Sequence, residues 1–259
     1  MIGLLSHLGV IQCSGKDSKT FLQGQLSCDL NKLTPGGNCL GAHCNLQGRA
    51  VSLFRLVHTA EENYFLVLPK TMVTIALDAL KKYAIFSKII LCDASHEIFL
   101  IGGDELMPES MPLPDGRYLS FHQHLSALGD YSVEWHQQDI MQGIPAVYPE
   151  TSGFFIPQRI NLVELGAISL KKGCYIGQEI LSRLYFKGTV KYKMFLEKIE
   201  SAEKLTPGEP VFNQLEKTCG HIVDSIIIGN ITYVLVEKLI EESSPLYIKG
   251  TLCLSLTHK

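Results

Sequence analysis

The chain has 259 residues and a formal net charge of −3, with 46% hydrophobic and 19% charged residues. This length allows two or three compact units with their own cores, and the composition excludes an intrinsically disordered protein. No apolar run reaches the ~18 residues that a membrane helix needs. The N-terminal segment also lacks the basic region and the cleavage site of a secretory signal. We therefore expect a soluble, cytoplasmic protein.

The N-terminal part predicts a strand, a turn and a short helix whose N-cap is Asp17 or Ser18. Two pairs of strands then flank a longer helix, an order that is typical of an antiparallel α+β layer and not of a doubly wound sheet. The expected strands are 50–57, 63–68, 89–92 and 98–101, and the expected helix is 71–86. Its apolar face contains Met72, Ile75, Ala79, Leu80 and Tyr83.

Proline and glycine cluster at 108–116, which indicates a crossing between units. A further strand is expected at 131–135, followed by an extended loop over 143–161. Short strand-like runs recur after about residue 190, and they predict a small closed or sandwich-like β-module. These runs are 192–199, 210–212, 219–229, 231–238 and 246–256.

The eight cysteines include no CxxC pair, which argues against a disulfide framework and a zinc site. The closest spacing joins Cys39 to Cys44, with His43 between them, but a second pair of ligands is missing. We therefore predict no metal site. Most of the cysteines stand in apolar, strand-like segments, where a thiol packs as a small hydrophobic group.

Charge is concentrated in the window 159–193, which holds seven basic and two acidic residues. Its net charge is therefore +5 in a chain of net charge −3. A basic face on an acidic protein indicates a defined anionic ligand, although a solvated cationic rim would give the same pattern.

The most informative segment is KGCYIGQE at 172–179, which follows Lys171 and precedes Arg183. It reads as a loop that enters a helix, with Gly173 placed for a tight turn. Cys174 is expected near the free N–H groups of that helix, after two lysines, and both features favour a thiolate. The alternative is an inert cysteine that stabilises a turn.

This octet resembles the signature of the YgfZ-type folate-binding proteins, relatives of the glycine-cleavage T-protein. Further blocks that look like the family's are FLQGQL at 21–26, HCNLQGR at 43–49, GIP at 143–145 and SGFFIPQ at 152–158. The resemblance implies an α+β fold, a ring of three units around a central cavity. It assigns 1–190 to the folate-binding region, with a ferredoxin-like unit inserted at 46–105, and 191–259 to a C-terminal β-barrel.

By resemblance, the expected ligand is tetrahydrofolate, and the residues expected to bind it are Trp135, Leu8, Tyr175 and Arg183. Trp135 matches a tryptophan of the family's folate cavity, and its alternative role is that of an ordinary core residue. Leu8 stands where the family often has an aromatic wall. Met141 replaces a glutamate that precedes the family's Gly-x-Pro block, and methionine is only a weak acceptor.

The resemblance does not imply the T-protein reaction. T-proteins have an acidic pair where this chain has Ser52 and Leu53. The loss of a well-placed acid or base costs about 10²–10⁴ in rate. The implied function is instead that of an accessory protein for iron–sulfur cluster assembly or repair, with client enzymes such as tRNA methylthiotransferases.

In this interpretation Cys174 is the functional thiol and Lys171, Lys172 and Arg183 control its electrostatics. Gly173 and Gly177 belong to the motif, while Gln178 and Glu179 anchor the loop. One alternative is a folate-dependent one-carbon transferase with another acceptor. A second is an RNA-binding module, against which we count the apparent lack of aromatic residues among the basic ones. No GxSxG motif supports a hydrolase.

Overall fold

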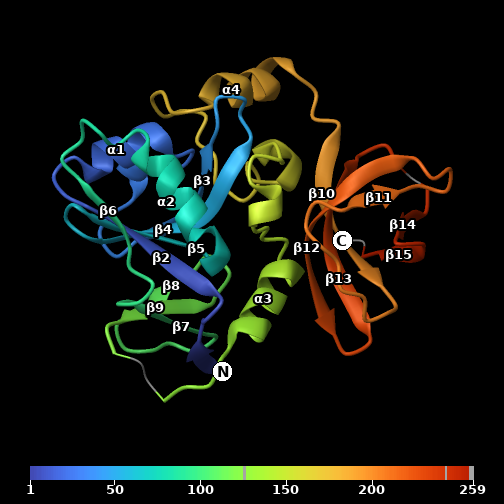
Figure 1. The fold of residues 1–259 in the computed structure, drawn as a ribbon, viewed down its shortest axis with the longest axis horizontal. Helices are drawn as coiled ribbons and strands as arrows, with labels where there is room; N and C mark the ends of the chain where they lie inside the picture. The colour runs from blue at the N-terminus through green and yellow to red at the C-terminus, as the bar shows by residue number, and fades with distance from the viewer. Residues whose placement is uncertain (125–126, 243, 257–259) are drawn as a thin grey trace.

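The computed structural model describes residues 1–124, 127–242 and 244–256. Two antiparallel sheets with short helices form the N-terminal part, and a closed barrel forms the C-terminal part (Figure 1). The α-helices are α1 (Ser18–Gln25), α2 (Val73–Lys81), α3 (Ser132–Met141) and α4 (Gln178–Lys187). Helix α3 lies between the sheets and the barrel (Figure 1).

The larger sheet has five antiparallel strands in the order β3-β4-β5-β2-β6. Their bounds are β3 (Asn38–Cys44), β4 (Ala50–Ala60), β5 (Asn63–Pro69), β2 (Leu8–Ser14) and β6 (Ile90–Asp93). Because side chains alternate along a strand, this sheet supplies two cores. Ile11 and Leu66 pack on the side of α1 and α2. Val10 and Val67 pack on the side of the smaller sheet.

The smaller sheet has the order β1-β7-β9-β8. Its strands are β1 (Ile2–Leu4), β7 (Phe99–Gly103), β9 (Tyr118–His122) and β8 (Met111–Pro112). Strand β7 belongs to this sheet, whereas β2 belongs to the larger one. Neither sheet therefore coincides with the unit expected at 46–105.

The barrel closes in the order β10-β13-β12-β11-β14-β15. Its strands are β10 (Tyr192–Ile199), β11 (Pro210–Phe212), β12 (Thr218–Ile228), β13 (Ile231–Leu239), β14 (Leu246–Ile248) and β15 (Thr251–Ser255). Its buried interior is formed by aliphatic side chains such as Ile222, Val234 and Ile248. The predicted α+β class with a C-terminal β-barrel is confirmed. None of the helices in the described ranges has the length and hydrophobicity needed to cross a membrane.

Two predicted elements differ from the observed ones. The strand expected at 131–135 is wrong, because Ser132 begins helix α3. The Asp130 carboxylate accepts hydrogen bonds from the backbone N–H and the hydroxyl of Ser132, which stabilises this helix start. The helix expected at 71–86 is shorter, since a 3₁₀ turn at Lys70–Met72 precedes α2. Tyr83 consequently lies beyond the helix and is exposed.

Candidate functional site

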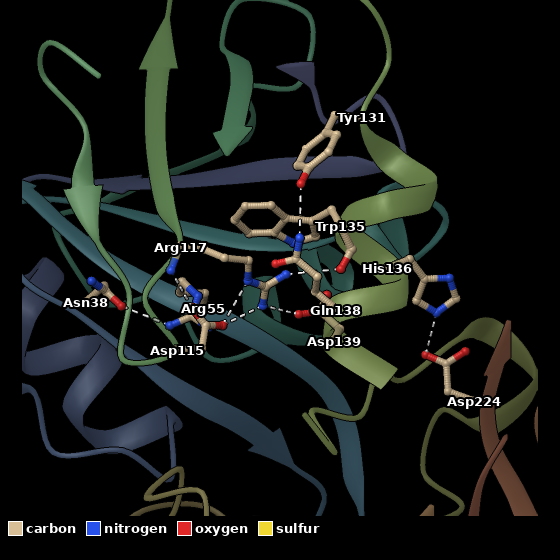
Figure 2. Close-up of polar contacts among 10 residues, drawn as sticks. All are labelled: Asn38, Arg55, Asp115, Arg117, Tyr131, Trp135, His136, Gln138, Asp139 and Asp224. Carbon is tan, nitrogen blue, oxygen red and sulfur yellow. Dashed lines mark hydrogen bonds and ion pairs between the residues drawn. The ribbon is translucent and has the colours of Figure 1, made fainter. Parts of the chain in front are cut away.

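A cavity of about 600 Å³ lies where the larger sheet, α3 and the barrel meet. Its walls are mainly apolar, with Leu8, Leu53 and Val67 from the sheet and Pro145 from the segment after α3. Its polar side chains come from the sheet, from α3 and from barrel strand β12 (Figure 2). A largely apolar cavity with few polar groups is typical of a small-molecule site.

Arg117, which is 2% exposed, organises the polar groups beside this cavity (Figure 2). Its Nε donates to Asp115 at 3.0 Å, and its Nη2 contacts both Asp115 and Asp139. Its Nη1 donates to the carbonyl oxygen of Trp135 at 3.1 Å. The guanidinium carbon also lies 4.0 Å from the centre of the Trp135 ring, in a cation–π arrangement.

Asp139 presents a carboxylate to the cavity. One oxygen contacts Arg117, and the other has no hydrogen-bond partner among the described residues. Burial raises the pKa of Asp139, and the charge of Arg117 offsets this only in part. Burial also acts on Asp115, but hydrogen bonds from Arg117 hold the pKa of Asp115 below its usual value. Asp139 is therefore the carboxylate of the pair with acceptor capacity left for a ligand.

His136 and Asp224 join α3 to the barrel (Figure 2). His136 Nε2 lies 3.0 Å from Asp224 Oδ2, and the Tyr148 hydroxyl donates to the same oxygen at 3.0 Å. Burial lowers the pKa of His136, but the hydrogen bond and charge of Asp224 outweigh this and raise it. Asp224 reaches this position at a register shift in β12, after Ile222.

His7 lies at the same cavity, with its ring centre 6.5 Å from that of His136. Its Nδ1 is buried without a hydrogen-bond partner. Burial, followed by the charge of His136, lowers the pKa of His7 from 6.5 to about 4. Between about pH 6.5 and pH 4 the unfolded chain therefore binds a proton at His7 that the folded chain does not.

Stability is consequently expected to fall as the pH drops from 7 to 5, by about 2 kcal/mol from His7 alone. Urea unfolding of wild type and His7→Asn at both pH values measures this contribution. The variant is expected to lose about 2 kcal/mol less than wild type over this range. His96→Asn, at an exposed histidine, is the matched control. Equal pH dependence in wild type and His7→Asn would contradict the buried neutral imidazole.

Two of the residues predicted to bind a ligand, Leu8 and Trp135, line the cavity. Trp135 is only 4% exposed, and its ring packs against Gly102, where an added Cβ would lie 2.5 Å from Cζ3. Arg117 covers one face of the ring. Trp135 is therefore largely a core residue. Only part of its ring faces the cavity, so less of the ring is available to stack on a ligand than the sequence predicted.

The KGCYIGQE segment lies outside this cavity, and none of its side chains is among the lining residues. Cys174 is exposed on the loop before α4. Tyr175 is buried in the core that also contains Cys44 and Leu181. Arg183 is exposed on α4. Tyr175 and Arg183, which were predicted to bind the ligand, are therefore not among the residues that line this cavity.

Lys172 differs most from its predicted role. Its Nζ donates to the carbonyl oxygens of Leu26 and Cys28, both at 2.7 Å, so the ammonium points into the fold and away from solvent. Burial lowers the pKa of Lys172 to about 8, against the opposing effects of Cys28 and Asp29. It is not a surface charge beside Cys174; of the two lysines, only Lys171 is exposed.

Gly177, and not Gly173, has the left-handed backbone that the motif requires, with φ +82°. A Cβ at Gly177 would lie 2.7 Å from the carbonyl oxygen of Asn45. Gly177 is the N-cap of α4, so Cys174 lies three residues before the N-cap and not in the first turn of the helix. Gln178 Nε2 donates to the Lys172 carbonyl at 3.4 Å, a long contact that links the two ends of the loop. Glu179 makes no capping hydrogen bond.

Sequence identity to known proteins shows the family of this chain. The chain is 34% identical to the tRNA-modifying protein YgfZ of Buchnera aphidicola, over 73% of this chain and 70% of that protein. It is 32% identical to the tRNA-modifying protein YgfZ of Colwellia psychrerythraea, over 74% and 69%. The chain belongs to the YgfZ family.

An uncharacterized protein of Haemophilus influenzae is 32% identical to this YgfZ-family chain, over 90% of the chain and 86% of that protein. No family model matches the chain. Among solved structures, aminomethyltransferase T of the glycine cleavage system from Bartonella henselae aligns with a TM-score of 0.65. This alignment covers 99% of the chain and 84% of that protein at 16% identity, so it shows a shared fold.

The sequence interpretation missed five polar residues in or beside this cavity: Arg55, Arg117, His136, Asp139 and Asp224. Asp139 follows Trp135 by four positions and thus lies on the same helix face. The mistaken strand at 131–135 hid this relation. No motif around Asp224 in the sequence indicates a role at the cavity, because only the packing of the barrel brings this residue to α3.

Proposed function

We propose that this chain is a cytoplasmic, tetrahydrofolate-binding accessory protein that supports iron–sulfur enzymes of tRNA modification. The observation that carries the proposal is the cavity of about 600 Å³, with an apolar lining and one free carboxylate oxygen at Asp139. The YgfZ relatives are tRNA-modifying proteins, and this supports tRNA modification as the pathway.

The cavity suits the parts of a folate. The Asp139 oxygen would accept N–H bonds from a pterin, and Leu8 with the Trp135 edge would pack on its rings. Arg55 and Lys70 also line the cavity and would attract the carboxylates of the glutamate tail. The chain thus offers an acceptor, an apolar surface and cations within one space.

The alternative, one-carbon transfer, lacks an acid at the expected place. Leu53 is apolar and lines the cavity. The Ser52 hydroxyl is buried without a partner and does not line it. Incubation with methylene- or formyl-tetrahydrofolate is expected to give no catalytic turnover, and sustained turnover would favour the transferase.

Because Cys174 is exposed and outside the cavity, we propose that it contacts a client enzyme and not the folate. In a strain that lacks the gene, wild type is expected to restore tRNA methylthiolation and iron–sulfur enzyme activity, whereas Cys174→Ala is not. Cys92→Ala, at a half-buried cysteine, is the matched control and is expected to rescue. Equal rescue by Cys174→Ala would remove this thiol from the mechanism.

A second candidate, direct contact with tRNA, is favoured by the surface of α4. Of the seven basic residues in 159–193, Lys172 is buried, Arg159 pairs with Glu237 and Lys193 pairs with Glu164. The remaining four are exposed without ion pairs among the described residues: Lys171, Arg183, Lys187 and Lys191.

Two aromatic rings stand among these cations. Tyr185 is 50% and Phe186 68% exposed, and the rings meet edge to face with centroids 5.1 Å apart. The expectation that the basic window lacks interleaved aromatic residues is therefore wrong. Exposed rings beside free cations suit stacked bases and phosphates.

Replacing Arg183, Lys187 and Lys191 by serine is expected to weaken tRNA binding and to reduce the salt slope. Each lost phosphate contact removes about 0.7–0.9 from the slope of log K against log salt, so three remove about 2–3. Fluorescence anisotropy with labelled tRNA between 50 and 200 mM KCl measures this. The control replaces three exposed lysines elsewhere: Lys32, Lys81 and Lys82. Equal slopes for both triple variants would exclude the α4 surface.

A further inference from the structure

A second, smaller cavity of about 290 Å³ adjoins the central one. The two share Leu40, Arg55 and Ile144 as lining residues. Cys39, on edge strand β3, lines only the smaller cavity and is partly exposed. A thiol is thus accessible in a chamber beside the candidate ligand site.

Cys39 has a second thiol as its neighbour. The buried Cys28 belongs to the core cluster against which Cys39 packs. The backbone of β3 supports this placement independently: a Cβ added at Gly41 would lie 2.6 Å from Cys28 Sγ. Residues 39 and 41 point to the same face of the strand, so Cys28 packs against the face that carries Cys39.

Two cations stabilise a negative charge at this pair. Lys172 places its Nζ at the carbonyl of Cys28, and Arg55 lies in the same chamber as Cys39. The neighbouring Cys28 thiol lowers the pKa of Cys39, and the charges of Arg55 and Lys172 add to this effect against burial. The neighbouring Cys39 thiol, with burial, raises the pKa of Cys28. Because Cys39 lines the cavity and Cys28 is buried, Cys39 is the nucleophile and Cys28 the proton-bearing partner.

We propose that Cys39 and Cys28 form a redox-active thiol pair that a hydroperoxide in the smaller cavity oxidises to a disulfide. The Cys39 thiolate attacks one peroxide oxygen, the O–O bond breaks, and hydroxide leaves to take up a proton as water. Cys39 is then a sulfenic acid. Cys28 sulfur attacks the Cys39 sulfur and expels hydroxide, which takes the Cys28 proton and leaves as a second water. Two thiols lose two electrons, and one hydrogen peroxide becomes two waters.

The other cysteines lack this arrangement. Burial raises the pKa of Cys13, Cys44, Cys92 and Cys253, which keeps these thiols protonated. The reaction does not require folate to bind, so it stands apart from the proposed function. Lys172, a residue of the KGCYIGQE segment, donates to the carbonyl of Cys28, so this segment contacts the inner pair.

The test treats the reduced full chain with one equivalent of hydrogen peroxide, alkylates the free thiols and maps the peptides by mass spectrometry. The expected product is a disulfide between the peptides of Cys28 and Cys39, with the loss of two hydrogen atoms. The rate of disulfide formation is expected to rise with pH to a plateau. The pH at half of this plateau is expected to be lower than for the reaction of free cysteine with peroxide.

Variants separate the two steps. Cys39→Ser is expected to abolish the disulfide, and Cys28→Ser to leave a sulfenic acid at Cys39 that a dimedone probe traps. Cys92→Ser is the control and is expected to leave the yield unchanged. Equal alkylation of Cys28 and Cys39 in wild type before and after peroxide, with loss only at Cys174, would overturn the proposal without reliance on any variant.

Discussion

Replacement of Arg117 by methionine is expected to lower the free energy of unfolding by about 3–5 kcal/mol. The guanidinium pairs with Asp115 and Asp139 and donates to the Trp135 carbonyl. Its side chain is 3% exposed, so the variant leaves two carboxylates without their shared partner where water has little access. Removal of one member of a buried ion cluster costs more than the cluster contributes net. Urea unfolding followed by circular dichroism measures the loss.

A double variant tests the physical reason. In Arg117→Met combined with Asp139→Asn, one of the two uncompensated charges is gone, so part of the lost stability is expected to return. Arg117→Lys is expected to be intermediate, because an ammonium lacks the fork that reaches two carboxylates and a carbonyl. A loss below about 1 kcal/mol in Arg117→Met would contradict the prediction, because it would show that the cluster contributes no more than an exposed ion pair does.

Asp139→Asn is expected to weaken tetrahydrofolate binding by about 10- to 100-fold, because a charge-assisted hydrogen bond contributes roughly 1.5–3 kcal/mol. The substitution keeps the size of the side chain, replaces one carboxylate oxygen by an NH2 group and removes the negative charge. Calorimetric titration at constant pH measures the dissociation constant. The oxygen that faces the cavity has no other partner among the described residues, so the ligand is the group that loses the bond.

Asp78→Asn is the matched control, since Asp78 is exposed on α2 and does not line the cavity. It is expected to bind tetrahydrofolate as wild type does. Circular dichroism checks that the Asp139→Asn protein is folded. An unchanged dissociation constant in a folded Asp139→Asn protein would exclude this carboxylate as the ligand's acceptor.

Local signals explain why the barrel was predictable. Its strands are short and end at turn residues such as Gly208, Gly229 and Gly250, all of which have positive φ. Hydrophobic alternation between these turns is visible in the sequence, and the observed strands follow the predicted runs closely. Turn chemistry and period-two patterning therefore made the barrel predictable.

The site was less predictable because its residues meet through tertiary packing. The run at 131–135 alternates in polarity and resembles a strand, but the carboxylate of Asp130 stabilises a helix start instead. Only on a helix do Trp135 and Asp139 share a face. Arg117 and Asp224 come from a hairpin and from the barrel, and nothing in their sequence neighbourhoods indicates a common cavity.

For the KGCYIGQE segment, the sequence predicted the backbone correctly but not the direction of every side chain. Its sequence correctly indicated a loop that enters a helix, and Cys174 is exposed. The order of residues could not reveal that Lys172 turns inward to Leu26 and Cys28. Adjacent residues in a loop can point in opposite directions, so proximity in sequence did not place both charges beside the thiol.

We propose above all that the cavity between the sheet, α3 and the barrel binds a folate. Trp135 is the chain's single tryptophan and lines this cavity, so its fluorescence reports on occupancy. Titration of the wild-type protein with tetrahydrofolate is expected to give a saturable change in Trp135 emission at one equivalent per chain. Emission that changes only in proportion to added folate, with no saturation and no heat of binding by calorimetry, would contradict the account.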